Sequence, residues 1–255
     1  MKMKQWFLGA VMAAGMGSAS HAALVAGDIN VIGYRADADD AIAFVTWQPL
    51  SAGTTIYFTD SGFFDDGTMR DSENIMSWTA PTGGIVAGTV VVIASPNGSS
   101  SADTGSTTGA LDGLSASGDQ VFVGDAAFTT AGDTTKPGSA YSGNFLYGLD
   151  FNGTAGWDAD ATSSNTSALP SALSGVNLNF SIAHVDNAQY TGSRTGLTID
   201  QFKTLIHNSS NWTTNDDGAT FGALSSTDFQ IVPEPGSFGL AAAGLLLIAK
   251  RRRTA

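Results

Sequence analysis

Short apolar or alternating runs recur along the middle of the chain, and turn-forming residues separate them. The runs are rich in Val, Ile, Thr, Phe, Tyr and Trp, whereas Gly, Asp, Asn, Ser and Pro bound them. This pattern is typical of the strands of an all-β sandwich. It predicts strands over residues 29–34, 41–47, 55–59, 75–79, 89–94, 120–124, 144–151, 180–185 and 228–232.

One segment, residues 198–207, follows a helical period instead. Thr198 and Gln201 have the spacing of a capping box, and apolar residues then recur on one face. His207 falls in the last turn, where a partly protonated imidazole would meet the negative end of the helix dipole. We favour capping over catalysis for this histidine.

Three stretches, residues 95–117, 129–144 and 152–174, consist mainly of Gly, Ser, Thr, Ala and Asp. They bury too little apolar surface to offset the entropy lost on ordering. We therefore expect long Gly/Ser/Thr loops at the surface, either as glycan acceptors or as soluble spacers.

The N-terminal residues 1–22 have the composition of a secretory signal helix. Two lysines precede an apolar stretch, and small side chains lie before the bond between Ala22 and Ala23. A signal peptidase is expected to cut there. The alternative, a transmembrane helix, is disfavoured because the stretch is short and contains several glycines.

The C-terminal end joins a prolyl turn, an apolar segment and a block of cations. Residues 238–249 would reach only about 18 Å as a helix, less than the roughly 30 Å hydrocarbon core, so length alone favours a buried helix. However, cations follow directly, and such side chains are almost never buried unpaired. We therefore predict a membrane helix over 238–249, with four basic residues on its cytoplasmic side: Lys250, Arg251, Arg252 and Arg253.

Pro233, Glu234 and Pro235, followed by a Gly/Ala/Leu-rich run and the Arg-rich end, resemble the PEP-CTERM sorting signal of exopolysaccharide-producing bacteria. The resemblance implies a temporary anchor in the inner membrane and a cut near Pro-Glu-Pro by an exosortase, a membrane cysteine transpeptidase. The chain then divides into a signal peptide (1–22), a β-sandwich domain (23–230) and a sorting signal (231–255).

Residues 23–232 contain five Lys or Arg residues against 22 Asp or Glu residues, a net charge of about −17. This balance repels nucleic acid, which requires clustered cations for binding, and it either suits divalent cations or simply maintains solubility. The chain has no cysteine, so disulfides and thiolate chemistry are excluded. It also lacks the Gly-x-Ser-x-Gly, His-Glu-x-x-His and P-loop motifs, so no catalytic residues are predicted.

Aspartates gather in the predicted turns and are the residues that could hold Ca²⁺, the one cofactor that the sequence suggests. None of them matches the spacing of an Asp-x-Asp-x-Asp-Gly calcium loop, and solvated turns are the alternative. The candidate ligands are Asp37, Asp39, Asp40, Asp60, Asp65 and Asp66.

Tryptophans could stack sugar rings, although most Trp residues of a sandwich pack in its core. Trp157 is the candidate ligand contact, because it lies in a polar stretch with Asp158 and Asp160. Trp47 and Trp78 lie in predicted strands, and Trp212 is the remaining tryptophan of the domain.

Residues 27–34, 37–45 and 52–60 resemble the opening of a bacterial lamin-tail-like module, and residues 185–192 and 211–213 also fit that group. The resemblance implies an immunoglobulin-like β-sandwich.

We expect an exported protein that is held at the inner membrane and then reaches the cell surface or extracellular matrix. Its expected role is structural or adhesive, linked to exopolysaccharide, and not enzymatic. Two alternatives remain: a carbohydrate-binding module, and a secreted hydrolase with an unrecognised Asp site.

Overall fold

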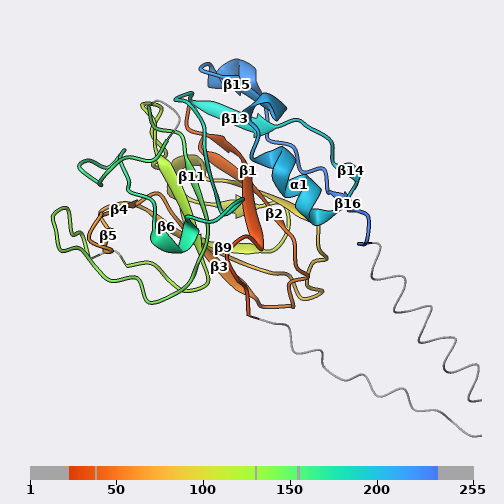
Figure 1. Cartoon of the computed structure of the whole chain (residues 1–255), viewed down its shortest axis with the longest axis horizontal. Helices are drawn as coiled ribbons and strands as arrows, with labels where there is room; N and C mark the ends of the chain where they lie inside the picture. The colour runs from red at the N-terminus through yellow and green to blue at the C-terminus, as the bar shows by residue number, and fades with distance from the viewer. Residues whose placement is uncertain (1–22, 38, 130, 154–155, 235–255) are drawn as a thin grey trace, which may run out of the picture.

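The computed structural model describes residues 23–37, 39–129, 131–153 and 156–234. They form a mostly β domain in which two six-stranded sheets pack together, and the short helix α1 (Ile199–Ile206) lies beside them (Figure 1). The predicted architecture of two packed sheets with one short helix is confirmed at this level.

The first sheet has the order β15-β13-β1-β2-β7-β8, and all its neighbours are antiparallel. Its strands are β1 (Ile29–Arg35), β2 (Ala41–Thr46), β7 (Val90–Ala94), β8 (Ser101–Ala102), β13 (Asn187–Tyr190) and β15 (Trp212–Asn215). The second has the order β12-β11-β10-β3-β6-β9, and only β11 and β12 are parallel. Its strands are β3 (Thr55–Thr59), β6 (Ile75–Thr79), β9 (Ser106–Gly109), β10 (Gln120–Gly124), β11 (Phe145–Asp150) and β12 (Asn179–Ser181).

Smaller elements connect and border these sheets. Two short pairs are the antiparallel β4 (Gly62–Phe63) with β5 (Met69–Arg70) and the parallel β14 (Thr195–Leu197) with β16 (Gln230–Ile231). The single-turn helix α2 covers Gly218–Phe221, and the 3-10 turns are η1 (Pro96–Gly98), η2 (Ser171–Leu173) and η3 (Ser209–Asn211).

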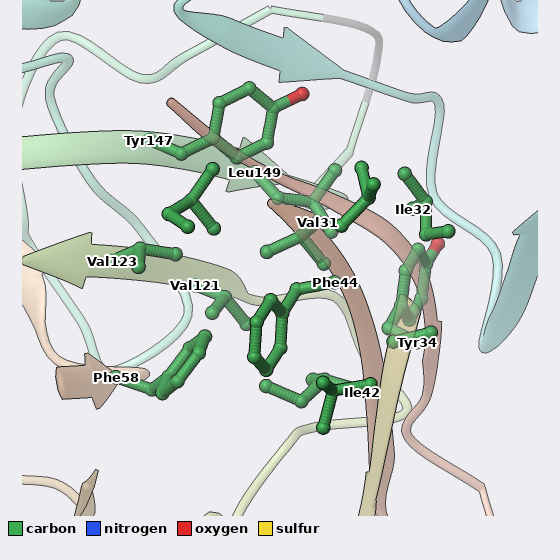
Figure 2. Packing of buried hydrophobic residues seen from close by; sticks show 14 of the residues in the cluster. Val31, Ile32, Tyr34, Ile42, Phe44, Phe58, Val121, Val123, Tyr147 and Leu149 are labelled. Carbon is green, nitrogen blue, oxygen red and sulfur yellow. The ribbon is translucent and has the colours of Figure 1, made fainter. Parts of the chain in front are cut away.

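The core lies between the sheets, where apolar side chains of β1 and β2 meet those of β3, β10 and β11 (Figure 2). Phe44 has no exposed surface, and its ring lies 5.4 Å from that of Phe58 and 5.3 Å from that of Trp78. Tyr34 stacks on Phe151 at 4.0 Å. Each contact joins the first sheet to the second or to the residue following it, so aromatic packing fixes the distance between the sheets.

Helix α1 packs against the same core. Its Phe202 ring lies 6.1 Å from that of Trp47 and meets Phe229 edge-on at 5.0 Å. The predicted capping box is confirmed, because Thr198 Oγ1 accepts from the Gln201 amide and Gln201 Oε1 accepts from the Thr198 amide. Local sequence therefore sets where this helix begins.

Thr198→Ala is expected to lower the free energy of unfolding by about 1 kcal/mol, because the amide at the third helical position loses its acceptor. Denaturant unfolding monitored by circular dichroism measures the change. Thr204→Ala, on the exposed surface of the same helix, is the matched control and should change stability by less than about 0.5 kcal/mol. Equal losses in both variants would contradict the capping role.

The structure corrects the prediction of loops in one stretch and adds strands elsewhere. Residues 95–117, expected to be a loop, contain β8 and β9, which pair with β7 and β6 at the sheet edges. An edge strand takes its hydrogen bonds from one neighbour and requires little apolar surface, so polarity alone did not exclude it. Strands β13, β14 and β15 were not predicted either, and β12 ends at Ser181, before the predicted 185.

The predicted signal helix (1–22) and membrane helix (238–249) lie outside the described residues. Among the residues that are described, no helix is both long enough and apolar enough to cross a bilayer.

Candidate functional site

The chain leaves the domain through the pair β14–β16. The Gln230 amide donates to the Arg194 carbonyl at 2.7 Å, and the Val232 amide donates to the Leu197 carbonyl at 2.9 Å. Val232 is 44% exposed, and the two residues after it, Pro233 and Glu234, are exposed as well. Two residues of the predicted sorting motif are thus accessible at the domain surface. Pro235 and the basic residues 250–253 lie outside the described residues.

Phe229 anchors the chain just before this exit. It is only 4% exposed, and its amide donates to the Gly88 carbonyl at 2.8 Å. The Arg194 guanidinium lies 5.1 Å from the Phe229 ring and donates to the Thr227 carbonyl at 2.5 Å. The domain is therefore firmly packed as far as residue 229.

The predicted calcium ligands lie at separate places. Asp37 Oδ2 accepts from the Gly218 amide at 2.9 Å, whereas Asp66 Oδ1 accepts from Thr68. Asp65 pairs with Lys136, which also pairs with Asp160. These aspartates hold turns together through protein donors.

The remaining three differ in burial. Asp39 is exposed, Asp40 is buried and accepts from the Leu114 amide at 3.1 Å, and Asp60 is fully buried. Within the described parts of the chain, no three Asp, Glu, His or Cys side chains are grouped so that they could hold a metal ion. The six aspartates therefore do not come together, and calcium binding stays a prediction without a gathered site.

The structure instead places two buried acidic residues, Asp60 and Asp119, beside Gln120, which is fully buried, and Glu73 is half-buried nearby. Gln120 Nε2 donates to Asp119 Oδ1 at 2.8 Å and also to the Asp60 carbonyl. Burial raises the pKa of Asp60 to about 6, and burial together with the nearby Asp60 charge raises the pKa of Glu73 to about 8. Burial and the Asp60 charge also raise the pKa of Asp119 well above its usual value. Glu73 therefore holds its proton at neutral pH, whereas Asp60 is mostly ionised there.

Sequence reasoning did not single out Asp119. The sequence feature that could have identified Asp119 is its position between Gly118 and the predicted strand over residues 120–124. Its carboxylate accepts from the amides of Ser115 and Gln120, at 2.9 and 2.8 Å, and so fixes the turn before β10.

Trp157 lies half-buried against the second sheet. Its ring stacks on Phe122 at 5.3 Å, and its Nε1 donates to Asn179 Oδ1 at 3.0 Å. One face and the indole N–H are therefore already used within the domain. Trp47, Trp78 and Trp212 are buried, as expected for core residues.

His207 caps helix α1, as predicted, but by hydrogen bonding more than by charge. Its Nδ1 lies 2.6 Å from the Lys203 carbonyl, and its Nε2 lies 3.1 Å from the Tyr147 hydroxyl. Burial lowers the pKa of His207, which favours the neutral imidazole over the partly protonated one expected from the sequence.

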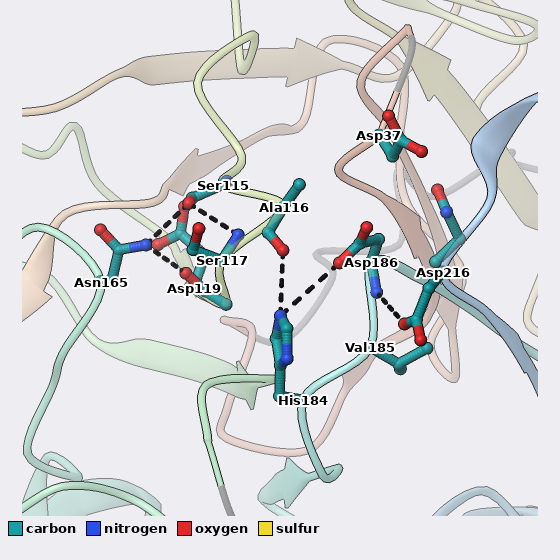
Figure 3. Close-up of polar contacts among 12 residues, drawn as sticks. Asp37, Ser115, Ala116, Ser117, Asp119, Asn165, His184, Val185, Asp186 and Asp216 are labelled. Carbon is teal, nitrogen blue, oxygen red and sulfur yellow. Dashed lines mark hydrogen bonds and ion pairs between the residues drawn. The ribbon is translucent and has the colours of Figure 1, made fainter.

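His184 lies in a different setting, beside two aspartates (Figure 3). Its Nε2 is 2.9 Å from the Ala116 carbonyl and 3.5 Å from Asp186 Oδ1. Because a carbonyl only accepts, Nε2 carries the proton here. Asp216 Oδ1 accepts from the Asp186 amide at 3.3 Å. Burial raises the pKa of Asp186, and the nearby charge of Asp216 raises it further.

An open pocket of about 440 Å³ adjoins this group. Its polar lining comes from Ser181, His184, Ser209, Thr214 and Asp216, and Trp212 contributes an apolar wall. The lining supplies hydroxyl, imidazole and carboxylate groups, which suit a hydroxylated ligand better than an apolar one.

Comparison with known proteins identifies the C-terminal segment of the chain and gives no match for the domain. Neither a curated protein nor a solved structure matches the chain, so the lamin-tail-like resemblance has no support from either. Residues 232–253 match the family model of the PEP-CTERM protein-sorting motif. The chain therefore carries at its C-terminal end the motif of exported proteins that an exosortase sorts to the cell surface.

Proposed function

We propose that the domain is a structural or adhesive component of the cell surface or extracellular matrix, linked to exopolysaccharide, and not an enzyme. The sorting motif carries this proposal, since it begins at Val232, which is still hydrogen-bonded to the domain through its amide. The packed, acidic two-sheet domain is then the part that sorting delivers. An immunoglobulin-like, lamin-tail-like assignment belongs to this proposal, and the two packed sheets are compatible with it.

The mature protein is expected to begin near Ala23 and to end near Pro233, because a signal peptidase and an exosortase remove the two ends. Intact-mass analysis of surface material measures both termini. Deletion of residues 233–255 should send the protein into the medium without retention. A mature form that still ends at Ala255 would contradict exosortase processing.

The pocket beside His184 favours a second candidate function, carbohydrate binding. Thr214 lines it, whereas its neighbour Thr213 does not, because successive side chains of β15 point to opposite faces. Thr214→Tyr should fill the pocket and lower retention by the organism's own exopolysaccharide at least about tenfold, a loss of roughly 1.4 kcal/mol. A pull-down with the mature protein measures this retention.

Thr213→Tyr is the matched control and should bind like the wild type. Trp157→Ala is a poorer probe, because Trp157 packs on Phe122 and its loss disturbs the domain. Equal retention of the Thr214→Tyr and Thr213→Tyr variants would contradict a sugar site in this pocket.

A further inference from the structure

The last residues of the domain divide into a firmly held part and a lightly held part. Phe229 is buried among aromatic rings of the core, whereas Gln230 is exposed and Ile231 is half-buried. The pair β14–β16 is separate from both six-stranded sheets. Residues 230–232 can therefore detach from β14 while Phe229 and the core stay in place.

The recognised motif leaves no spacer between itself and this strand pair. It begins at residue 232, and the Val232 amide still donates to the Leu197 carbonyl at 2.9 Å. Residues 233–237 separate Val232 from the apolar segment, and the chain can extend at most roughly 20 Å over that interval. An enzyme acting at the membrane therefore meets the motif directly beside the folded domain.

An enzyme that binds a peptide in extended form uses the backbone groups of that peptide for hydrogen bonds. The amides of Gln230 and Val232 are already bonded, to the carbonyls of Arg194 and Leu197. The same N–H group cannot serve β14 and an enzyme at once. An enzyme that uses these two amides on the domain side of Pro233 thus requires β16 to leave β14.

We propose that residues 230–232, once released from β14, form the domain-side contact surface for the processing exosortase, so that the β14–β16 pair limits the rate of processing. The inference rests on the exosortase sorting of this chain. It extends the recognised surface by two residues, 230 and 231, which belong to the folded domain. It also explains why Phe229 is packed so firmly, since it stops the detachment at the edge of the core.

A disulfide across the pair tests the proposal in the full chain. Thr195 and Gln230 are register partners, both are exposed, and the protein has no cysteine of its own. Neighbouring strands lie about 4.8 Å apart, within the Cα separation that a disulfide spans. In cells that process the wild type, the oxidised variant Thr195→Cys/Gln230→Cys should lose its C-terminal tail at least tenfold more slowly, as measured by intact mass. Reductant should restore the rate.

Thr55→Cys/Thr79→Cys is the matched control. Thr55 on β3 and Thr79 on β6 are register partners, and their hydroxyl oxygens lie 3.0 Å apart. A disulfide between them cross-links the domain at strands that are distant from β16 in the sequence. The control should be processed at the wild-type rate.

Leu197→Ala provides the opposite change, because it removes apolar contact from β14 without altering residues 230–253. It should be processed faster than the wild type. Equal rates for the oxidised Thr195/Gln230 variant and the control would overturn the proposal, and so would unchanged processing of Leu197→Ala. If the wild type itself kept its C-terminal tail, that result would contradict exosortase processing of this chain, and the present proposal would be contradicted as a consequence.

Discussion

Replacing Phe44 by alanine is expected to lower the free energy of unfolding by about 3–5 kcal/mol. Phe44 is fully buried in β2, and its ring packs against Phe58 and Trp78 of the opposite sheet. The substitution removes the transfer free energy of the ring and leaves a cavity that two rigid sheets cannot close. With no cysteine in the chain, no disulfide offsets the loss.

Urea unfolding of the mature domain, followed by tryptophan fluorescence, measures this change. Val86→Ala is the control, because Val86 is 70% exposed and its truncation should cost less than about 0.5 kcal/mol. A loss below about 1 kcal/mol for Phe44→Ala would mean that the sheets do not pack through this ring.

The second large effect expected is on pH dependence: the domain should be more stable at pH 5 than at pH 8, by roughly 2–4 kcal/mol. Burial raises the pKa of Asp60 to about 6, that of Asp40 to about 7 and that of Glu73 to about 8. An acid with a raised folded-state pKa holds its proton more tightly when folded. The added stability is therefore complete below the unfolded-state pKa and is lost as the pH rises through the folded-state pKa.

The pH range over which each acid loses its stabilising contribution follows from its unfolded-state and folded-state pKa values. For Asp60 the loss runs from 3.8 to about 6, and for Glu73 from 4.5 to about 8. His207 acts in the opposite direction, because burial lowers its pKa and acidification then favours the unfolded state. At Asp71, hydrogen bonds outweigh burial and lower the pKa, so that group loses its contribution only below pH 3.8. Several carboxyl groups outweigh one imidazole between pH 5 and 8.

Glu73→Gln isolates one member of the group, since glutamine resembles the protonated acid. Its partial exposure screens the charge, so the gain at pH 8 should be only about 1–2 kcal/mol, with little change at pH 4. Thermal unfolding across this pH range measures both values. Asp66→Asn, at an exposed turn, removes one carboxylate outside this group and is the control; it should not reproduce the gain at pH 8. A wild-type domain that loses stability steadily from pH 8 to pH 5 would contradict the raised pKa values.

Local sequence determined those elements whose signals are contained within a few residues. Each predicted strand segment overlaps a strand of the structure, because alternating or apolar β-rich runs can bury a face in only a few ways. The capping box at Thr198 set the start of α1 for the same reason. The sorting motif was readable because its order along the chain, and not its folded shape, is what defines it.

Only the tertiary structure decided which distant residues meet. Composition gave no indication that β8 and β9 would join the sheet edges, since their backbone partners are supplied by β7 and β6. Nor did it indicate that the charge of the buried Asp60 would raise the pKa of Asp119 and of the half-buried Glu73, while the six predicted calcium ligands would not form a metal site. Burial and long-range pairing arise from the packing of whole sheets. The pKa of a carboxyl group and the pairing of an edge strand therefore depend on residues that are distant in the sequence, and a local sequence pattern cannot predict them.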